Sequence, residues 1–422
     1  MEATRIRLAE GVHLTYLPAR KFKTSLLSAQ FVTPLRRETA GANALLAAVL
    51  RRGTVSCPDM GALSAKMDNL YDASIDYTVR KKGENQCVGF VASFIDDRYA
   101  PDGERLLEPA AALLGELICD PVTYHGRFVP EYFESEKTNL LEAIRSLIND
   151  KRDWADSRLL RALCDGEAYA VPRLGDEETV DKLQALKVYT QYRDLISTAP
   201  LEIIYSGSAD LERVKQALAA AFATLPREEV RVISTAAPHV CRESVQHVED
   251  VLDVTQGKLG MGFSCGSDDM PALLMGNTLF GGSSNSKLFL NVREKLSLCY
   301  YASSLYHRQK GLITVSSGIE FQNYQRAYDE IMAQLEAVQK GELEDWELEG
   351  ARSTLLNSYA TVGDSQGKLE NFYLGQAATG QHETPADLAR AIQDMTAERI
   401  CRAMSTVKLD TVYFLKGKEA EA

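Results

Sequence analysis

A short segment of the chain occurs twice and constrains the fold more than any other feature. Residues 197–205 read STAPLEIIY and residues 405–413 read STVKLDTVY, so Ser, Thr, Leu, an acidic residue, β-branched residues and a final Tyr recur in register. The pattern of each copy predicts an amphipathic helix, a short turn and an apolar strand. Residues 25–31 (SLLSAQF) and 257–263 (GKLGMGF) predict equivalent early strands. The order is the same in both halves, which predicts a duplicated αβ unit.

The length of the chain agrees with this duplication. A chain of 422 residues is too long for one ordinary core and fits two domains of about 200 residues each. Periodicity is lost after residue 222, where prolines and glutamates interrupt a polar stretch. The predicted division is an N-terminal domain over 1–222, a linker over 223–246 and a C-terminal domain over 247–422.

The predicted elements alternate between helices and neighbouring pairs of strands. The segments 12–16 and 25–32 form one such pair, joined by the basic turn 20–23. This arrangement is typical of an α+β fold with mainly antiparallel sheets packed against helices. Further strands are predicted at 75–77, 86–94, 252–263 and 311–317. Helices are predicted at 41–50, 60–72, 105–118, 131–149, 154–164, 176–197, 270–279, 324–339 and 342–359.

Composition excludes several classes of protein. A hydrophobic content of 45% with 25% charged residues is typical of a soluble globular chain. No run of 18 apolar residues occurs and the first 22 residues contain no apolar signal segment, so we expect no membrane span. A net charge of −12 argues against nucleic acid as a partner. Eight scattered cysteines without a C-x-x-C pair indicate reduced thiols, and the expected location is cytoplasmic.

The segment 281–301, GGSSNSKLFLNVREKLSLCYY, carries the clearest candidate chemistry. It opens with a Gly-Gly-Ser-Ser turn, which supplies backbone freedom and helix-capping hydroxyls. Leu288, Val292 and Leu296 then predict one apolar stripe of an amphipathic helix, and a strand follows toward Tyr306.

Arg293 late in this helix and Tyr300 on the strand can point at one place in space. A guanidinium is a fixed fork of donors and a phenol is a rigid donor, so the pair could hold a peptide carbonyl and stabilise an oxyanion. The structural alternative is an arginine in a surface ion pair with Glu294 and a half-buried strand tyrosine.

The whole chain resembles peptidase family M16, in the branch of two-domain subunits that includes mitochondrial processing peptidase. That family carries a G-x-x-H-x-x-E-H motif followed by Gly-Thr, and here residues 41–48 (GANALLAA) and 53–54 (GT) take its place. The two histidine ligands fall on Ala44 and Ala48, and the glutamate base falls on Ala47. A third ligand, a glutamate on a later helix, falls on Ala143, or on Glu142 if the register shifts by one. The resemblance implies the LuxS/processing-peptidase-like metallohydrolase fold.

Alanines at these positions cannot form the metal site of the family. A catalytic zinc needs three nitrogen, oxygen or sulfur ligands, an open position and a nearby base. None of the six histidines stands four residues from another. We therefore expect no metal in this chain, and the resemblance places zinc in a partner subunit.

The second-domain signature of the family is retained. Its pattern R-E-x-x-x-L-x-Y matches Arg293, Glu294, Leu298 and Tyr300. The resemblance implies that the tyrosine stabilises the tetrahedral intermediate and that the arginine holds a substrate carbonyl, at a zinc site in the first domain or in a partner.

Two functional hypotheses follow. In the first, this chain pairs with an M16 subunit that carries H-x-x-E-H and donates Arg293 and Tyr300 to a composite site that cleaves oligopeptides. In the second, it is a non-catalytic scaffold or peptide-binding protein with the M16 fold, acting as a homodimer. Either hypothesis predicts a dimer that buries roughly 1,500 Å² or more.

Overall fold

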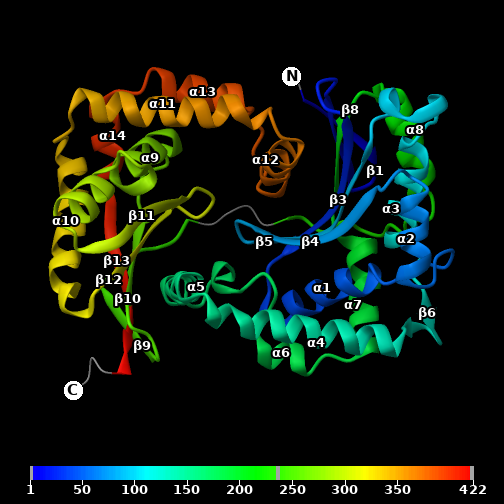
Figure 1. The fold of residues 1–422 in the computed structure, drawn as a ribbon, viewed down its shortest axis with the longest axis horizontal. Helices are drawn as coiled ribbons and strands as arrows, with labels where there is room; N and C mark the ends of the chain where they lie inside the picture. Colours follow the sequence, from blue (N-terminus) through cyan, green and yellow to red (C-terminus); the bar gives the residue numbers. More distant parts are fainter. Residues whose placement is uncertain (1–2, 234–237, 419–422) are drawn as a thin grey trace. The chain divides into compact units, whose positions relative to one another are not determined.

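The computed structural model describes residues 3–233 and 238–418. Contacts divide these residues into two compact units, each built around one large sheet (Figure 1). Unit 1 comprises the described residues of Met1–Arg145, Val171–Thr235 and Gly363–His382. Unit 2 comprises those of Ser146–Ala170, Ala236–Val362 and Glu383–Ala422. The predicted division into domains 1–222 and 247–422 with a linker over 223–246 follows the duplication in the sequence, not the contacts between residues. This division stays a prediction. Residues 234–237 of that linker lie outside the described residues.

The sheet of unit 1 has six strands in the order β1-β2-β8-β3-β5-β4. All neighbours are antiparallel except β2 and β8, which are parallel. The prediction that the segments 12–16 and 25–32 pair with each other is wrong, because β8 lies between them. Every residue of β8 is buried, as expected of a central strand. The strands are β1 (Thr4–Ala9), β2 (Val12–Pro18), β3 (Thr24–Pro34), β4 (Ser74–Lys82), β5 (Asn85–Ile95) and β8 (Leu201–Gly207).

Helices cover both faces of this sheet. Leu27, Ala29 and Phe31 of β3 belong to the main core with α1, whereas Ser28 between them donates a hydrogen bond to Glu370 of α12. Because side chains alternate along a strand, α1 and α12 lie on opposite faces (Figure 1). The helices are α1 (Arg37–Leu50), α2 (Met60–Asp68), α3 (Leu107–Cys119), α4 (Pro130–Ser146), α6 (Glu177–Asp181), α7 (Ala185–Thr198), α8 (Leu211–Ala221) and α12 (Gln366–Ala378), and a small hairpin pairs β6 (Thr123–Tyr124) with β7 (Arg127–Phe128).

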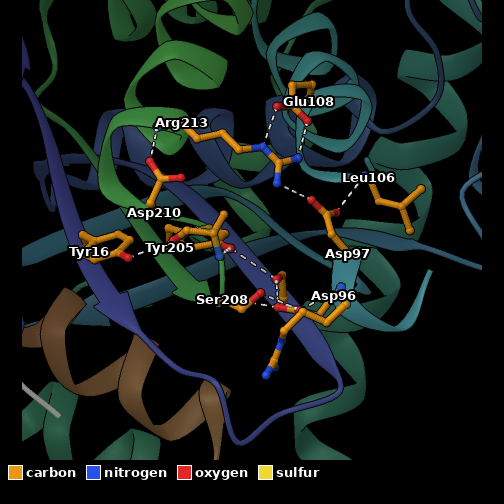
Figure 2. A network of polar contacts seen from close by, with 12 residues as sticks. Tyr16, Asp96, Asp97, Leu106, Glu108, Tyr205, Ser208, Asp210 and Arg213 are labelled. Atoms are coloured by element: carbon orange, nitrogen blue, oxygen red, sulfur yellow. Dashed lines mark hydrogen bonds and ion pairs between the residues drawn. The ribbon is translucent and has the colours of Figure 1, made fainter. Parts of the chain in front are cut away.

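A polar network joins the ends of β5 and β8 in unit 1 (Figure 2). The buried carboxylate of Asp96 accepts hydrogen bonds from the backbone and hydroxyl of Ser208 and from Arg98. Arg213 of α8 pairs with both Asp97 and Glu108. Burial alone would raise the pKa of Asp96, but its donors outweigh burial and hold the pKa below the ordinary value.

The sheet of unit 2 repeats five strands of the first one. Its order β9-β13-β10-β12-β11 corresponds to β2-β8-β3-β5-β4, again with a parallel pair at β9 and β13 and antiparallel pairing elsewhere. The repeated segments ending in Tyr205 and Tyr413 lead into β8 and β13, and both tyrosines are fully buried. The predicted duplication and α+β fold are confirmed. The strands are β9 (Gln246–Leu252), β10 (Gly257–Cys265), β11 (Cys299–His307), β12 (Leu312–Ile319) and β13 (Val407–Gly417).

Each sheet also receives one helix from the other half of the sequence. α12 packs on β3 and β8 of unit 1, and α5 packs on β10 and β13 of unit 2. Glycines on β10 permit this contact, because a Cβ at Gly260 or Gly262 would lie 3.2 or 2.7 Å from side-chain atoms of Leu159 or Leu163. The helices of unit 2 are α5 (Lys151–Leu163), α9 (Met270–Asn277), α10 (Tyr324–Lys340), α11 (Asp345–Val362), α13 (Pro385–Gln393) and α14 (Ala397–Met404), with π-helical turns η5 (Thr278–Gly282) and η6 (Leu288–Lys295).

Across residues 3–233 and 238–418, no helix combines the length and the apolar character that crossing a membrane requires.

Candidate functional site

The positions of the degenerate zinc motif lie on α1 and α4 of unit 1. Ala44 and Ala48 stand one helical turn apart, and together with Ala143 they line a pocket of about 480 Å³. Glu142, the alternative counterpart of the third ligand, is not among the lining residues. Ala47 is fully buried in the main core and does not line this pocket.

The walls of this alanine pocket come from the edge strand β4 and from α4. Tyr77 and Val79 contribute from β4, and Glu136 contributes from α4. Glu136 is the one carboxylate among the lining residues, and it is held at 3.0 Å by Arg52 and at 3.2 Å by the amide of Asn139. The acidic group in the pocket is therefore already paired within unit 1.

Zinc does not fit this pocket. The three alanines offer no ligand atom, and the lining residues contain no histidine or cysteine. Glu136 could supply one oxygen, but a catalytic site needs three protein ligands. The chain resembles a metallopeptidase in sequence, but this pocket lacks the side chains that would bind the metal.

The second candidate site lies in unit 2, where η6 leads into β11. Leu288 and Val292 are buried as predicted. Leu296 is exposed, so the prediction that it belongs to the same apolar stripe of the helix is wrong. The helix is wound as a π-helix and ends at Lys295, and the backbone N–H of Leu296 donates to Asn291, five residues back. The wider winding and the early end turn Leu296 outward, and Leu298 takes the buried position instead.

Arg293 and Tyr300 are both accessible but contact different partners. The guanidinium of Arg293 lies 4.7 Å from the ring centroid of Phe289, and its Nε is 3.6 Å from Glu294. Tyr300 is 62% exposed, and its hydroxyl donates to Glu320 at 2.6 Å. This contact with Glu320 raises the pKa of Tyr300 above its usual value, because the carboxylate stabilises the protonated phenol.

The strand geometry explains why Tyr300 and Tyr301 differ. Pairing of β11 with β12 shifts between Cys299 and Tyr301, so Tyr300 occupies a β-bulge. Tyr301, on the other side of the strand, lines a pocket of about 350 Å³ together with Arg293. Tyr300 does not line this pocket.

Arg152 of α5 also lines the pocket shared by Arg293 and Tyr301. Its guanidinium lies 4.4 Å from the ring centroid of Tyr301 and donates to the hydroxyl of Ser303 at 3.2 Å. Sequence reasoning missed Arg152 because it belongs to the first half of the chain, more than a hundred residues from the motif. The one available signal was a basic residue two positions before the predicted helix 154–164.

A buried charged cluster forms a separate feature of unit 2. His239 contacts Glu167 at 2.5 Å through Nδ1 and Asp410 at 3.2 Å through Nε2. Lys310, 1% exposed, pairs with Glu167, and Arg242 pairs with Asp410 at 2.6 Å. The pKa of Asp410 is lowered because these donors outweigh the effect of its burial.

Part of this cluster has the composition of a metal site. Among the described residues, Cys164, Glu167 and His239 are the one group of three whose ligand atoms lie within 4.8 Å of one another. Both ring nitrogens of His239 already contact carboxylates, and the ammonium of Lys310 forms an ion pair with Glu167. Because Lys310 already neutralises the carboxylate of Glu167, we interpret the cluster as a buried ion-pair network and not as a metal site.

Comparisons with known proteins found a matching family model and relatives that cover most of the chain. Residues 182–355 match the family described as "Peptidase M16 inactive domain". The chain is 34% identical over 416 residues to "Probable inactive metalloprotease YmfF" of Bacillus subtilis, covering 97% of this chain and 96% of that protein. It is 22% identical over 325 residues to "Uncharacterized zinc protease YmxG" of the same organism, covering 74% and 76%.

The solved structures include one that is similar over nearly the whole length. A conserved protein from Enterococcus faecalis has 27% sequence identity and a TM-score of 0.89, with 99% of both chains covered. The full-length relative and the matched family place this chain in peptidase family M16.

Proposed function

We propose that this chain is a catalytically incomplete M16 subunit. It pairs with an M16 subunit that carries H-x-x-E-H and contributes Arg293 and Tyr300 to a composite site that cleaves oligopeptides. The proposal rests on the difference between the two candidate sites of this chain. The metal-ligand positions Ala44, Ala48 and Ala143 line a pocket without ligands, whereas Arg293 and Tyr300 keep exposed polar groups.

The accessibility of the pair supports a role toward another molecule. The side chain of Arg293 is 41% exposed, and its contact with Glu294 is longer than an ordinary hydrogen bond. An exposed ion pair of this kind contributes little to stability, so its free energy does not oppose binding of a substrate carbonyl. The relatives in Bacillus subtilis also support the proposal, because that organism has one protein named as inactive and one named as a zinc protease.

The roles in the proposed complex follow from the donor chemistry. Arg293 would hold a substrate carbonyl through its fork of N–H donors. Tyr300 would move its hydroxyl hydrogen bond from Glu320 to the oxyanion that forms on the scissile carbonyl. Zinc in the partner subunit would activate the attacking water, and this chain would contribute hydrogen-bond donors but no metal ligand.

One observation favours the alternative of a non-catalytic scaffold or peptide-binding homodimer. The hydroxyl of Tyr300 is already satisfied by Glu320. A tyrosine that serves only the surface of unit 2 needs no further partner, and in that case the chain would bind peptides or a second copy of itself without taking part in cleavage.

Reconstitution with a zinc-bearing M16 subunit from the same host distinguishes these functions. The two chains are purified separately, mixed, and examined by sedimentation and by cleavage of a quenched fluorescent peptide. The proposal predicts a heterodimer whose turnover exceeds that of either chain alone. A homodimer that leaves the activity of the zinc-bearing subunit unchanged would support the scaffold instead.

A further inference from the structure

The pocket beside η6 has a charge opposite to that of the chain as a whole. We call it the two-arginine pocket and define it by Arg152, Ser284, Phe289, Arg293, Tyr301 and Ser303. No carboxylate occurs among its lining residues, although the chain carries a net charge of −12. A concave site of one charge sign concentrates ligands of the opposite sign. The pocket is therefore suited to an anion.

Its two cations are not neutralised by close partners. Among the residues that the structure describes, no carboxylate lies within 4.0 Å of the guanidinium of Arg152. The nearby carboxylate of Asp150 caps α5 by accepting the backbone N–H groups of Arg152 and Asp153. Within the same described part of the chain, the one carboxylate within 4.0 Å of Arg293 is that of Glu294, at 3.6 Å. Both guanidinium groups keep donor capacity for a ligand.

Aromatic rings hold both guanidinium groups in place. Arg152 lies over Tyr301 and Arg293 over Phe289, with 4.4 and 4.7 Å between each guanidinium carbon and the ring centroid. Stacking engages the face of the guanidinium and leaves its N–H edge available for hydrogen bonds. Arg152 also donates to Ser303, whose own hydroxyl proton then remains free to donate.

We propose that the two-arginine pocket binds a carboxylate group of a peptide. This inference rests on the proposed function, because it takes the ligand of the chain to be a peptide. A planar carboxylate matches the fork of an arginine in a bidentate pair, and a second arginine and a serine hydroxyl supply further donors. The carboxylate comes either from the C-terminus of the peptide or from an acidic side chain, and the pocket recognises the same chemistry in both.

Peptide binding by the isolated chain tests this inference separately from turnover of the complex. The probes are three pools of fluorescein-labelled decapeptides, none of which contains Asp. The first pool has a free C-terminal carboxylate and no Glu, the second has a C-terminal amide and no Glu, and the third has a C-terminal amide and one central Glu. Anisotropy titrations measure the dissociation constants. The free acid or the Glu-bearing amide should bind roughly tenfold more tightly than the plain amide, and which one does so identifies the source of the carboxylate.

Arg152→Gln should abolish this discrimination, and Arg152→Lys should restore it only in part because an ammonium lacks the fork. Arg402→Gln is the matched control, since Arg402 lies on α14 with its side chain 75% exposed and does not line the pocket. Melting temperatures of all variants report folding. Equal affinity for the three pools, discrimination retained in Arg152→Gln, or no binding at all would overturn the inference. If the complex still turns over peptide in that event, the proposed function survives without it.

Discussion

The hydroxyl of Tyr300 donates a 2.6 Å hydrogen bond to a carboxylate oxygen of Glu320. Tyr300 is exposed and occupies a β-bulge, so the contact lies at the surface of unit 2 and can exchange with water or a ligand. A donor held by its own chain is oriented before any substrate arrives. The same contact must break if Tyr300 acts on a substrate.

Replacing Tyr300 by Phe removes one donor to the oxyanion with little change of volume. In the complex with a zinc-bearing subunit we expect turnover to fall on the order of 100-fold, with a smaller change in KM, because the donor acts as charge develops. Arg293→Lys should also lower turnover, since an ammonium cannot reproduce the guanidinium fork. Both variants should melt at nearly the wild-type temperature because both side chains are accessible. Full activity in both variants would return these residues to structural roles.

Replacing Glu320 by Gln should lower the pKa of Tyr300 toward the ordinary value of about 10. The carboxylate raises this pKa through its hydrogen bond and its negative charge, and a neutral glutamine removes the charge. The ionisation of Tyr300 can be followed by NMR of ring-labelled tyrosine, with Tyr300→Phe used to assign the signal. An unchanged pKa would mean that the contact with Glu320 is not kept in solution.

Purified chain should contain no stoichiometric zinc at the alanine pocket, as measured by metal analysis after dialysis. The combined variant Ala44→His, Ala48→His and Ala143→Glu should acquire one zinc per chain, because these three positions line one pocket of about 480 Å³. The double histidine variant that retains Ala143 should bind zinc more weakly. Tight zinc in the unmodified chain, or none in the combined variant, would show that the ligand positions are assigned incorrectly.

Replacing Asp410 by Asn should destabilise unit 2 by about 3 kcal/mol, since breaking a buried charge pair leaves its partner uncompensated. Asp410 is fully buried and accepts hydrogen bonds from the backbone and side chain of Arg242 and from Thr411. Urea unfolding measures the change. The matched control Glu398→Gln, at an exposed pair on α14, should change the stability by less than about 0.5 kcal/mol. Similar effects in the two variants would contradict the role assigned to the cluster.

Acid should destabilise unit 1 through the network of Asp96. Hydrogen bonds from Ser208 and Arg98 outweigh burial and depress its folded pKa, so its stabilising contribution is complete above the unfolded pKa of about 3.9 and is lost as pH falls through the folded value. In Asp96→Asn the melting temperature should start lower and decline less between about pH 5 and about pH 3. An identical decline in the variant and the wild type would exclude Asp96 as a contributor.

Local sequence patterns determined much of this protein. The repeat ending in Tyr205 and Tyr413 predicted two homologous halves, and both tyrosines lie on corresponding strands, β8 and β13. The apolar run 41–50 predicted a buried helix, and its alanines at 44, 47 and 48 already excluded the family's metal site. These features depend on contacts close in sequence or on side-chain chemistry, which a sequence displays directly.

Contacts between distant segments were decided only by tertiary structure. β8 lies between β2 and β3 because a strand that is buried along its whole length is most stable at the centre of a sheet, and this placement overrides the short connection between its neighbours. α5 and α12 each pack on the sheet of the opposite half, which brings Arg152 beside Arg293 and Tyr301. The π-helical winding of η6 and the bulge at Tyr300 then direct Tyr301 into the pocket and Tyr300 toward Glu320. Side-chain direction depends on hydrogen-bond register, which is a property of paired segments and cannot be read from either segment alone.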